Sequence, residues 1–267
     1  MSPANGLECE GRVALVTGAS RGIGAAIAER LARAGARVAV SARTLDPDPK
    51  YVGSLNETVE RIHANGGEAI AVKCDISSSE DRERMLAETV ERLGPVDILV
   101  NNAAVTFLAP FMDFSEKRFR LMFEVQVRAP YELSQLVVPS MRERGGGWIL
   151  NISSRIATHP IGPPFDEVQK QGFTVYAMVK ASLDRFTTAL AAELHDDRIA
   201  VNSLAPWDNV ATPGAGAHDL VDGFRLEDID LMAESALALC SGDPTKMTGR
   251  IAFSQPLLAE LQRRPQR

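Results

Sequence analysis

The sequence predicts an α/β fold in which helices cover both faces of a doubly wound parallel sheet. The first observation is that short apolar runs alternate along the chain with longer amphipathic segments. The second is that the apolar runs hardly alternate in polarity, as strands buried on both faces do. In such sheets ligands bind beyond the carboxyl ends of the strands, so we expect the functional site there.

Six apolar runs are predicted strands, and a seventh is expected near the end of the chain. The strands are expected at residues 12–18, 36–43, 68–76, 96–103, 147–154, 199–206 and 250–254. Amphipathic segments predict helices at residues 24–34, 55–64, 79–93 and 115–128. Between these elements, Pro160, Pro163 and Pro164 predict a stiff loop before residue 176. We expect one domain over residues 1–267, with its core at about residues 11–253.

Composition argues against several classes of partner. The 267 residues are 45% hydrophobic, and 29 basic against 35 acidic residues give a net charge of -6. The sequence has no basic stripe of the kind that binds nucleic acid. It also has no run of about 18 apolar residues, the length that a membrane span needs. The first residues lack a secretory pattern, and the three cysteines, Cys9, Cys74 and Cys240, are scattered. We therefore expect a cytoplasmic protein.

No metal site is expected either. The four histidines have neither the spacing nor the carboxylate neighbours of a metal centre. They are His63, His159, His195 and His218. Loop or surface roles are the simpler interpretation.

The stretch "VTGASRGIG", residues 16–24, places three glycines between the first predicted strand and helix. Such a turn directs backbone N–H groups at an anion, and pyrophosphate is the natural ligand. The spacing Gly-x-x-x-Gly-x-Gly differs from the commoner Gly-x-Gly-x-x-Gly, and a tight turn without a ligand is an alternative.

The end of the second strand indicates which dinucleotide would bind. An acid there would bond the ribose 2′-hydroxyl, whereas an arginine would accept a 2′-phosphate. The strand ends with Ala42 and Arg43, and Arg21 in the glycine turn offers a second positive charge. NADP(H) is favoured and NAD(H) is possible, although both arginines could simply be solvated.

A third group of residues can transfer a proton. Tyr176 and Lys180 are four residues apart in "VYAMVKASLDRF" and share one helix face. A phenol has a pKa near 10, so a tyrosine that exchanges protons near neutrality needs a nearby cation. Ser153 and Ser154 end a strand in "ILNISSR" and could hold a carbonyl oxygen beside the phenol.

Five motifs in order, "TGASRGIG", "NNAA", "NISS", "YAMVK" and "VNSLAP", resemble the short-chain dehydrogenase/reductase family over about residues 11–206. The resemblance implies a single Rossmann-type domain that binds NAD(P) and moves hydride between the cofactor and a carbonyl or alcohol carbon. It also implies a homodimer or homotetramer with a small carbonyl or alcohol substrate. Apolar Leu121, Phe123, Leu183 and Phe186 suit such an interface, or face the core.

The resemblance also assigns roles to individual residues. For the cofactor these are Gly18, Ser20, Gly22, Ile23 and Gly24 at the phosphates, Asp75 at the adenine, Ala103 beside the adenosine ribose and Thr212 at the carboxamide, with Asn102 and Pro206 as further cofactor-binding residues. Asn101 would support the central strands. Ser154 would orient the substrate and Tyr176 would be the acid/base. Lys180 would lower the pKa of the phenol and bind the nicotinamide ribose.

Three departures from the family pattern limit this transfer. Gln126 stands where the family usually has a proton-relay asparagine, and Trp207 replaces the glycine of a Pro-Gly turn. The segment between Ser154 and Tyr176 is also longer than usual. Trp207 either covers the substrate or packs beneath the nicotinamide, and Arg155 either binds a substrate carboxylate or faces water. An alternative function is a dinucleotide-binding regulator or scaffold with lost or reduced turnover.

Overall fold

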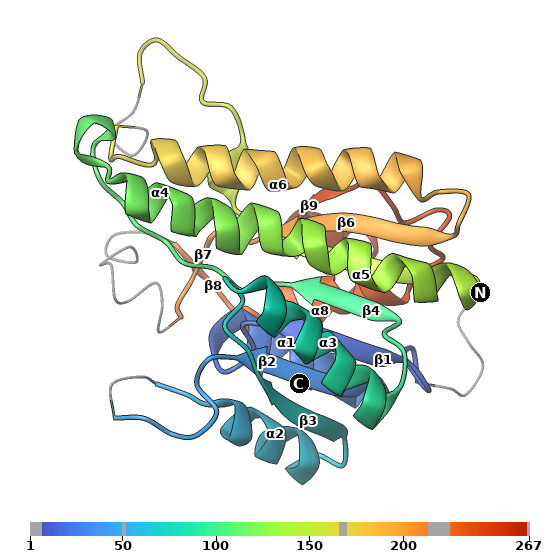
Figure 1. Cartoon of the computed structure of the whole chain (residues 1–267). Coiled ribbons are helices and arrows are strands. Elements are labelled where there is room, and N and C mark those ends of the chain that lie inside the picture. The colour runs from blue at the N-terminus through green and yellow to red at the C-terminus, as the bar shows by residue number, and fades with distance from the viewer. Residues whose placement is uncertain (1–6, 50–51, 166–169, 213–224, 266–267) are drawn as a thin grey trace.

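The apolar runs form one seven-stranded parallel sheet in the order β3-β2-β1-β4-β5-β6-β9 (Figure 1). The computed structural model describes residues 7–49, 52–165, 170–212 and 225–265. The strands are β1 (Val13–Thr17), β2 (Arg37–Ala42), β3 (Glu68–Lys73), β4 (Ile98–Asn101), β5 (Gly147–Ile152), β6 (Ile199–Ala205) and β9 (Ile251–Phe253). The expected doubly wound α/β architecture is confirmed, and each of the seven strands lies within its predicted range.

Helices cover both faces of this sheet. They are α1 (Gly22–Arg33), α2 (Leu55–Ala64), α3 (Ser79–Leu93), α4 (Glu116–Phe123), α5 (Ala129–Glu143), α6 (Thr174–Glu193), α8 (Ile229–Ser241) and α9 (Ser254–Glu260). Side chains of α1, α2 and α8 pack in one apolar cluster, and those of α3, α5 and α6 pack in a second on the opposite face.

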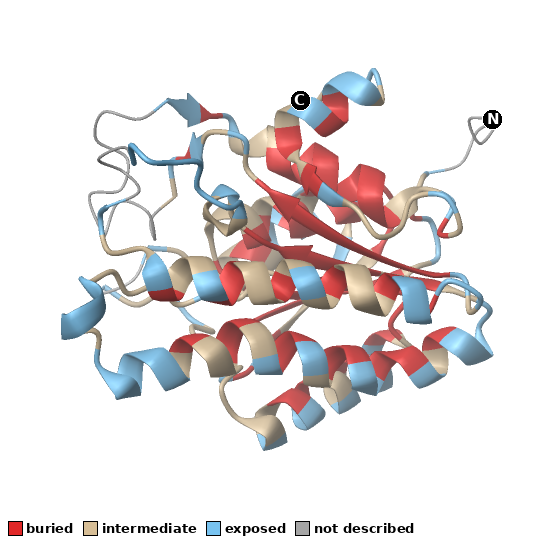
Figure 2. Cartoon of the chain, turned by 90° about the horizontal axis from the view of Figure 1, so that it is seen from above, coloured by how far each residue is buried: buried red, intermediate tan, exposed pale blue. Residues whose placement is uncertain are grey.

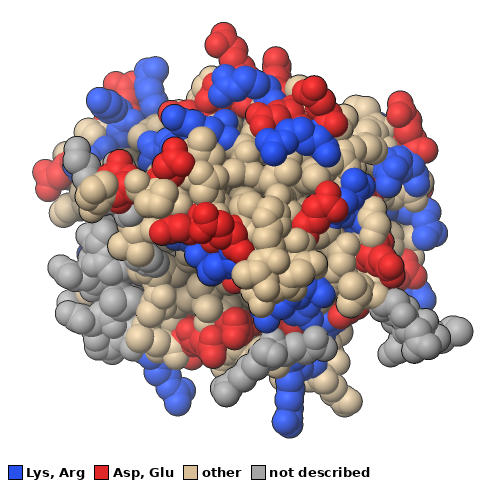
Figure 3. Space-filling model, turned by 90° about the horizontal axis from the view of Figure 1, so that it is seen from below, with Lys and Arg blue, Asp and Glu red and all other residues tan. Residues whose placement is uncertain are grey.

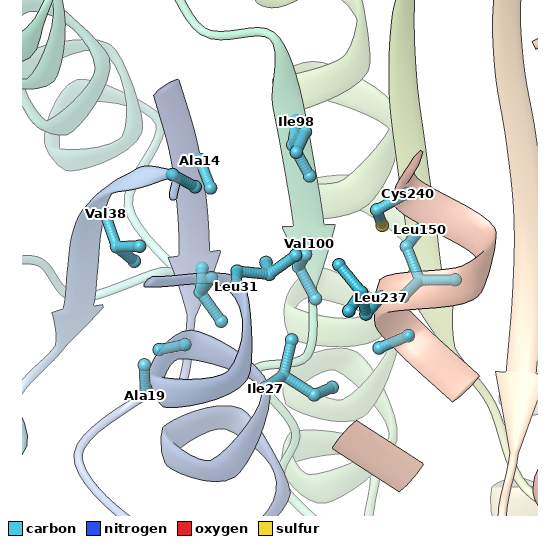
Figure 4. Close-up of a cluster of buried hydrophobic side chains, with 14 of the residues drawn as sticks. Ala14, Ala19, Ile27, Leu31, Val38, Ile98, Val100, Leu150, Leu237 and Cys240 are labelled. Carbon is cyan, nitrogen blue, oxygen red and sulfur yellow. The ribbon is translucent and has the colours of Figure 1, made fainter. Parts of the chain in front are cut away.

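Burial explains why the strand sequences carry so few polar residues. Every residue of β1, β4 and β6 is buried, and Figure 2 shows the strands enclosed by helices whose buried and exposed positions alternate. Figure 4 shows Ile27 and Leu31 of α1 facing Val100 and Leu150 of the sheet beside Leu237 of α8. This packing fixes the sheet edge from which the functional loops leave.

Serine caps set the start of three helices. Ser54, Ser78 and Ser115 precede α2, α3 and α4, and each side chain accepts a hydrogen bond from the backbone N–H three residues later. Such caps satisfy donors that the first helical turn leaves unpaired. The bounds predicted for residues 55–64 and 79–93 are confirmed.

The helix expected to end at residue 128 is longer, so that boundary is wrong. After α4 the backbone forms one π-helical turn, η2 (Glu124–Arg128), and continues as α5. Pro130 comes just after this π turn; because proline has no N–H to donate and its ring crowds the turn before it, the helix departs from α geometry here. Single π turns occur often at functional positions.

Two small elements were not predicted. β7 (Asn209–Val210) and β8 (Leu226–Glu227) pair as a two-stranded parallel ribbon at the end of the molecule drawn at the left of Figure 1. Between Ser154 and Tyr176, the described residues contain one 3-10 turn, η3 (Arg155–Ala157), in the segment predicted as a loop. Its stiffness stays a prediction.

Charged side chains link the helices. Arg30 of α1 pairs with Glu234 of α8 at 2.7 Å between Nε and Oε2, and Arg263 bonds both Glu234 and Glu8. On the face seen in Figure 3, basic and acidic side chains are interspersed. Within the described residues, no helix combines the length and apolarity that a membrane crossing requires.

Candidate active site

The glycine turn between β1 and α1 has the backbone shape that the sequence predicts. Gly18 and Gly22 have φ values of 67° and 59°, which favour glycine. A Cβ on Gly24 would overlap Asn102 Nδ2 and lie 2.5 Å from the Gly18 carbonyl oxygen. Asn102 Nδ2 donates to the carbonyl oxygens of Thr17 at 2.9 Å and Gly18 at 3.0 Å, so this side chain holds the turn in place.

The first turn of α1 offers unpaired donors. Arg21 is its N-cap residue, and the Arg21 side chain forms no capping hydrogen bond. The backbone N–H groups of an uncapped helix start, together with the helix dipole, favour an anion. The turn therefore fits a pyrophosphate, and a Cβ at Gly24 would fill part of this turn.

A cleft of about 300 Å³ opens beside this turn and gathers most of the predicted cofactor residues. Those in its lining are Gly18, Ser20, Arg21, Gly22, Ile23, Gly24, Arg43, Asp75, Asn102, Ala103 and Thr212. Pro206, Tyr176 and Lys180 are outside that lining. The cleft follows the carboxyl ends of β1, β2, β3 and β4, as expected for an adenine nucleotide in this type of sheet.

Two predicted cofactor residues already bond within the chain. Arg21 Nη1 donates to the Val52 carbonyl oxygen at 3.1 Å, which ties the glycine turn to the segment after β2. Asp75 Oδ1 accepts hydrogen bonds from the backbone N–H and the hydroxyl of Ser77. Arg43 is exposed at the rim. The guanidinium of Arg43 is therefore accessible to a phosphate, whereas one carboxylate oxygen of Asp75 already accepts hydrogen bonds from Ser77.

The predicted catalytic hydroxyls lie together beyond the end of β5. Tyr176 is in the first turn of α6, and its phenol lies beside the side chains of Ser154 and Thr106. Burial raises the pKa of Tyr176, although these two neighbouring hydroxyl groups favour the ionised phenol and oppose the shift. The chain alone therefore holds this phenol in its protonated form.

Lys180 follows one turn later and is 4% exposed. Its Nζ donates to the Ile152 carbonyl oxygen at 2.8 Å and lies 5.9 Å from the centroid of the Tyr176 ring. Burial lowers the pKa of Lys180 to about 8, and the nearby charge of Asp184 opposes this shift. The expected lowering of the phenol pKa by Lys180 is not seen in the chain alone, because desolvation dominates at Tyr176.

Asp184 completes a row of three polar residues on this face of α6. It follows Lys180 by one turn and accepts a hydrogen bond from Ser203 Oγ of β6 at 2.6 Å. Burial raises the pKa of Asp184, while Ser203 and the charge of Lys180 lower it. The carboxyl group is thus the nearby charge that favours the protonated state of Lys180.

Gln126 occupies the π-helical turn η2 and is 1% exposed. Its Nε2 donates to the Val105 carbonyl oxygen at 2.8 Å, and its Oε1 has no partner in the described part of the chain. Val105 lines the cofactor cleft and Thr106 meets Tyr176. Gln126 therefore fixes the segment that joins the cleft to the catalytic hydroxyls.

A buried amide pair ties the central strands together below the site. Asn101 Nδ2 of β4 donates to Asn151 Oδ1 of β5 at 2.9 Å, and Asn151 Nδ2 donates to Thr187 Oγ1 of α6 at 2.9 Å. This chain of bonds connects the strand ends to the helix that carries Tyr176. Asn101 thus has the strand-supporting position expected of it.

The turn after β6 is held by a buried carboxylate. Glu227 of β8 accepts from the backbone N–H groups of Trp207 and Asp208, each at 3.2 Å, and from the Ser254 hydroxyl. Trp207 packs its ring edge on Phe253 at 5.7 Å between centroids. Trp207 is 41% exposed, and Arg155 lies over its ring.

The short chain dehydrogenase family model matches residues 12–217. The chain belongs to the short-chain dehydrogenase family. Two kinds of curated relative are similar over 94% of the chain. The 7α-hydroxysteroid dehydrogenase of Escherichia coli is 35% identical, and 95% of its length is covered. The human hydroxysteroid dehydrogenase-like protein 2 is 30% identical, and the chain spans only 58% of its length.

Solved structures show the same fold. A 7α-hydroxysteroid dehydrogenase in complex with NADH and 7-oxo glycochenodeoxycholic acid is 33% identical, with a TM-score of 0.81 over 95% of this chain and 96% of that one. A hydroxysteroid dehydrogenase from Escherichia coli is 34% identical, with a TM-score of 0.77 over 94% and 97% of the two chains.

Three residues near the site of this short-chain dehydrogenase escaped the sequence reasoning. Thr106 has a detectable signal, because it follows "NNAA" by two residues and lies beyond the same strand end. Asp184 shares a helix face with Tyr176 and Lys180, so a spacing of four could have found it. Glu227 has no local signal, since it meets Trp207 from 20 residues away.

The structure also bears on metal binding, the predicted interface residues and a second cleft. Among the described residues, no group of three or more potential ligands could hold a metal ion, and His218 lies outside them. Leu183 is buried and Leu121 lines the cofactor cleft, so neither is available to a partner subunit. A second cleft of about 590 Å³, at the amino-terminal ends of the strands, contains none of the predicted residues.

Proposed function

We propose that this chain is an NADP(H)-dependent oxidoreductase that transfers hydride between the cofactor and a carbonyl or secondary alcohol, with Tyr176 as the acid/base. The observation that carries the proposal is the placement of the Tyr176 phenol beside the Ser154 side chain, one helical turn from Lys180. This group lies next to a cleft whose glycine turn suits a dinucleotide.

Each residue has a role in reduction, for which the cofactor supplies the hydride. Ser154 holds the substrate oxygen within reach of the phenol. Tyr176 donates its proton to that oxygen as negative charge develops there. Lys180 keeps a positive charge behind the phenol and stabilises the phenolate that remains. In oxidation the same groups act in reverse.

Arg43 supports a preference for NADP(H). It is exposed at the rim of the cleft, and Ala42 beside it has no acid that would repel a 2′-phosphate. Arg21 lines the same cleft, with one nitrogen bonded to Val52. A related structure binds NADH, so NAD(H) is the outcome that would contradict this assignment.

The substrate we propose is an apolar alcohol or ketone of the hydroxysteroid kind. Two relatives are hydroxysteroid dehydrogenases or are named as similar to them. Near the catalytic hydroxyls, Phe107 packs in the cluster that contains Tyr176, and Phe111, Ile161 and Phe165 are exposed in the adjoining loops. Exposed apolar side chains of this size are typical of a binding surface.

We also propose a homodimer formed through α4, α5 and α6. Exposed apolar side chains on these helices include Phe119, Tyr131, Leu136 and Met178. Phe186, predicted for this interface, contacts Tyr131 at 6.0 Å between ring centroids. Light scattering at micromolar concentration tests the assembly, and a monomer would contradict it.

Tyr176→Phe tests the central proposal. The variant keeps the ring and loses the proton donor, so turnover should fall at least about 100-fold. The dissociation constant for NADPH, measured by fluorescence, should change less than twofold. Thr245→Val is the control, because it also removes one hydroxyl, which bonds only Asp243 among the described residues and lies outside the site and the proposed interface. Retention of more than a tenth of the wild-type rate would refute Tyr176 as the acid/base.

Arg43→Asp tests the cofactor assignment. Removing the cation and adding an acid should weaken NADPH binding about 100-fold and favour NADH. Arg33→Asp, an equal change of charge on an exposed arginine at the far end of α1, is the control. Wild-type protein that binds NADH as tightly as NADPH would contradict the assignment.

A further inference from the structure

The residue after Ser154 places an unneutralised positive charge beside the catalytic hydroxyls. Arg155 begins the 3-10 turn η3 and is exposed. Its Nη1 donates to the Trp207 carbonyl oxygen at 2.8 Å. No acidic side chain of the described residues forms an ion pair with it, whereas exposed arginines such as Arg61 and Arg142 have one.

The position of this guanidinium is fixed by Trp207. The Arg155 Cζ lies 5.4 Å from the centroid of the indole ring, a distance at which cation and ring attract. The indole is itself supported, because its edge packs on Phe253 and its backbone N–H is bonded by Glu227 and Ser254. A flexible arginine is thereby held in one place before any ligand arrives.

A guanidinium held in this way suits a carboxylate. Arginine carries five N–H donors in a planar fork, and the described chain uses one of them here. A carboxylate accepts two parallel hydrogen bonds from such a fork. The exposed Trp207 beside it offers apolar surface to the body of the same molecule. Charge and apolar surface therefore occur together at the end of β5.

We propose that Arg155, positioned by Trp207, binds a carboxylate of the substrate, so that the preferred substrate is an apolar alcohol or ketone that also carries an acid group. This inference rests on the proposed function, because it assigns the substrate class of the same site. Ser154 and Arg155 then divide the recognition between them. Ser154 holds the reacting oxygen, and Arg155 holds the acid group at a distance from it.

The test compares one ketone with and without its charge. The probes are 7-oxo glycochenodeoxycholic acid and its methyl ester, and 4-acetylbenzoate and its methyl ester as a smaller pair. In at least one of the two pairs, wild-type kcat/KM with NADPH should be at least tenfold higher for the acid than for its ester. Most of this difference should come from a lower KM for the acid. Added salt should raise KM for the acid and leave that for the ester unchanged.

Arg155→Met should reduce kcat/KM for the acid to the value of the ester and leave the ester within twofold of wild type. Arg155→Lys should keep part of the preference, since it keeps the charge and loses the fork. Arg142→Met is the control, because Arg142 is exposed at the far end of α5 and pairs with Asp197. The NADPH dissociation constant should be the same in all four proteins.

Several results would overturn the inference. They are equal use of acid and ester by the wild type, a preference that survives Arg155→Met, or a weaker NADPH affinity in that variant, which would place the guanidinium at the cofactor. If neither pair is turned over, calorimetric titration of the NADPH-bound protein decides. If the acid then binds tenfold more tightly than its ester, the carboxylate site is supported although the proposed reaction fails. Equal affinities for acid and ester would contradict the carboxylate site.

Discussion

The two halves of the sheet build their parts of the site by different means. In the half formed by β1 to β4, the glycine turn is held by Asn102 and by backbone geometry. In the half formed by β5, β6 and β9, the turn at Trp207 is held by side chains of Arg155, Glu227 and Ser254. Backbone shape recognises a phosphate that all dinucleotides share, whereas side chains can be exchanged to suit a substrate.

Glu227→Ala should have the largest effect and should be confined to the second half. The change removes the carboxylate acceptor of the part-buried Asp208 N–H and of the buried Ser254 hydroxyl, and leaves the Trp207 N–H with Ser254 alone. We expect the free energy of unfolding in urea to fall by about 3 kcal/mol or more. Affinity for NADPH should remain within threefold of wild type.

Glu260→Ala is the control for this comparison, since Glu260 is an exposed carboxylate that pairs with Arg250. Its loss should cost about 1 kcal/mol or less. Equal losses in the two variants would show that the Trp207 turn does not depend on Glu227.

Lys180→Met should raise stability near neutral pH, because burial of the charge lowers the lysine pKa from 10.5 to about 8. Between these values the unfolded chain binds more protons than the native chain, so the free energy of unfolding rises with pH. Below about pH 8 Lys180 is protonated in the native chain, and burial of its charge lowers the free energy of unfolding by on the order of 3 kcal/mol. Loss of the bond to Ile152 offsets part of the gain, so we expect about 2 kcal/mol.

Urea unfolding of wild type and Lys180→Met from pH 7 to 10 measures this difference. The raised pKa values of Cys9, Cys74 and Cys240 make the free energy of unfolding fall with pH above about pH 9. This effect is the same in both proteins, so the difference between them reports on Lys180. The advantage of the variant should shrink as the pH rises from 8 to 10. An advantage that is constant over this range would be inconsistent with a buried charge.

Gly24→Ala should weaken NADPH binding about 30-fold. The added Cβ would lie 2.5 Å from the Gly18 carbonyl oxygen, which is backbone, so the turn must shift, at a cost of about 2 kcal/mol. Gly242→Ala is the matched control, because its Cβ would have neighbours no closer than 3.4 Å and its φ is -67°. Unchanged affinity in Gly24→Ala would show that this turn does not contact the phosphates.

Gln126→Asn should have the smallest effect. The shorter side chain loses its bond to the Val105 carbonyl oxygen, which is worth about 1 kcal/mol. Turnover should be preserved or raised if this position serves the proton relay. A fall of more than tenfold in kcat, with unchanged NADPH affinity, would show instead that Val105 must be held by glutamine.

The sequence predicts the first half of the site better than the second, for a physical reason. Gly18, Gly22 and Gly24 lie within seven residues of one another, and their shape follows from local backbone geometry. Trp207 and Arg155 were each singled out, but their contact joins segments 52 residues apart. The pKa directions of Tyr176 and Lys180 also depend on burial, which no spacing of residues reveals.

The strand order has a consequence for synthesis on the ribosome. β2 joins β1 and β3 joins β2, after which β4 joins the free edge of β1, and β5, β6 and β9 follow outward in turn. No strand has to enter between two that are already paired. The nascent chain can therefore enlarge its sheet one edge at a time as it emerges. Once residue 101 has left the ribosome, β1 to β4 can already be paired, and with them the glycine turn that receives the phosphates.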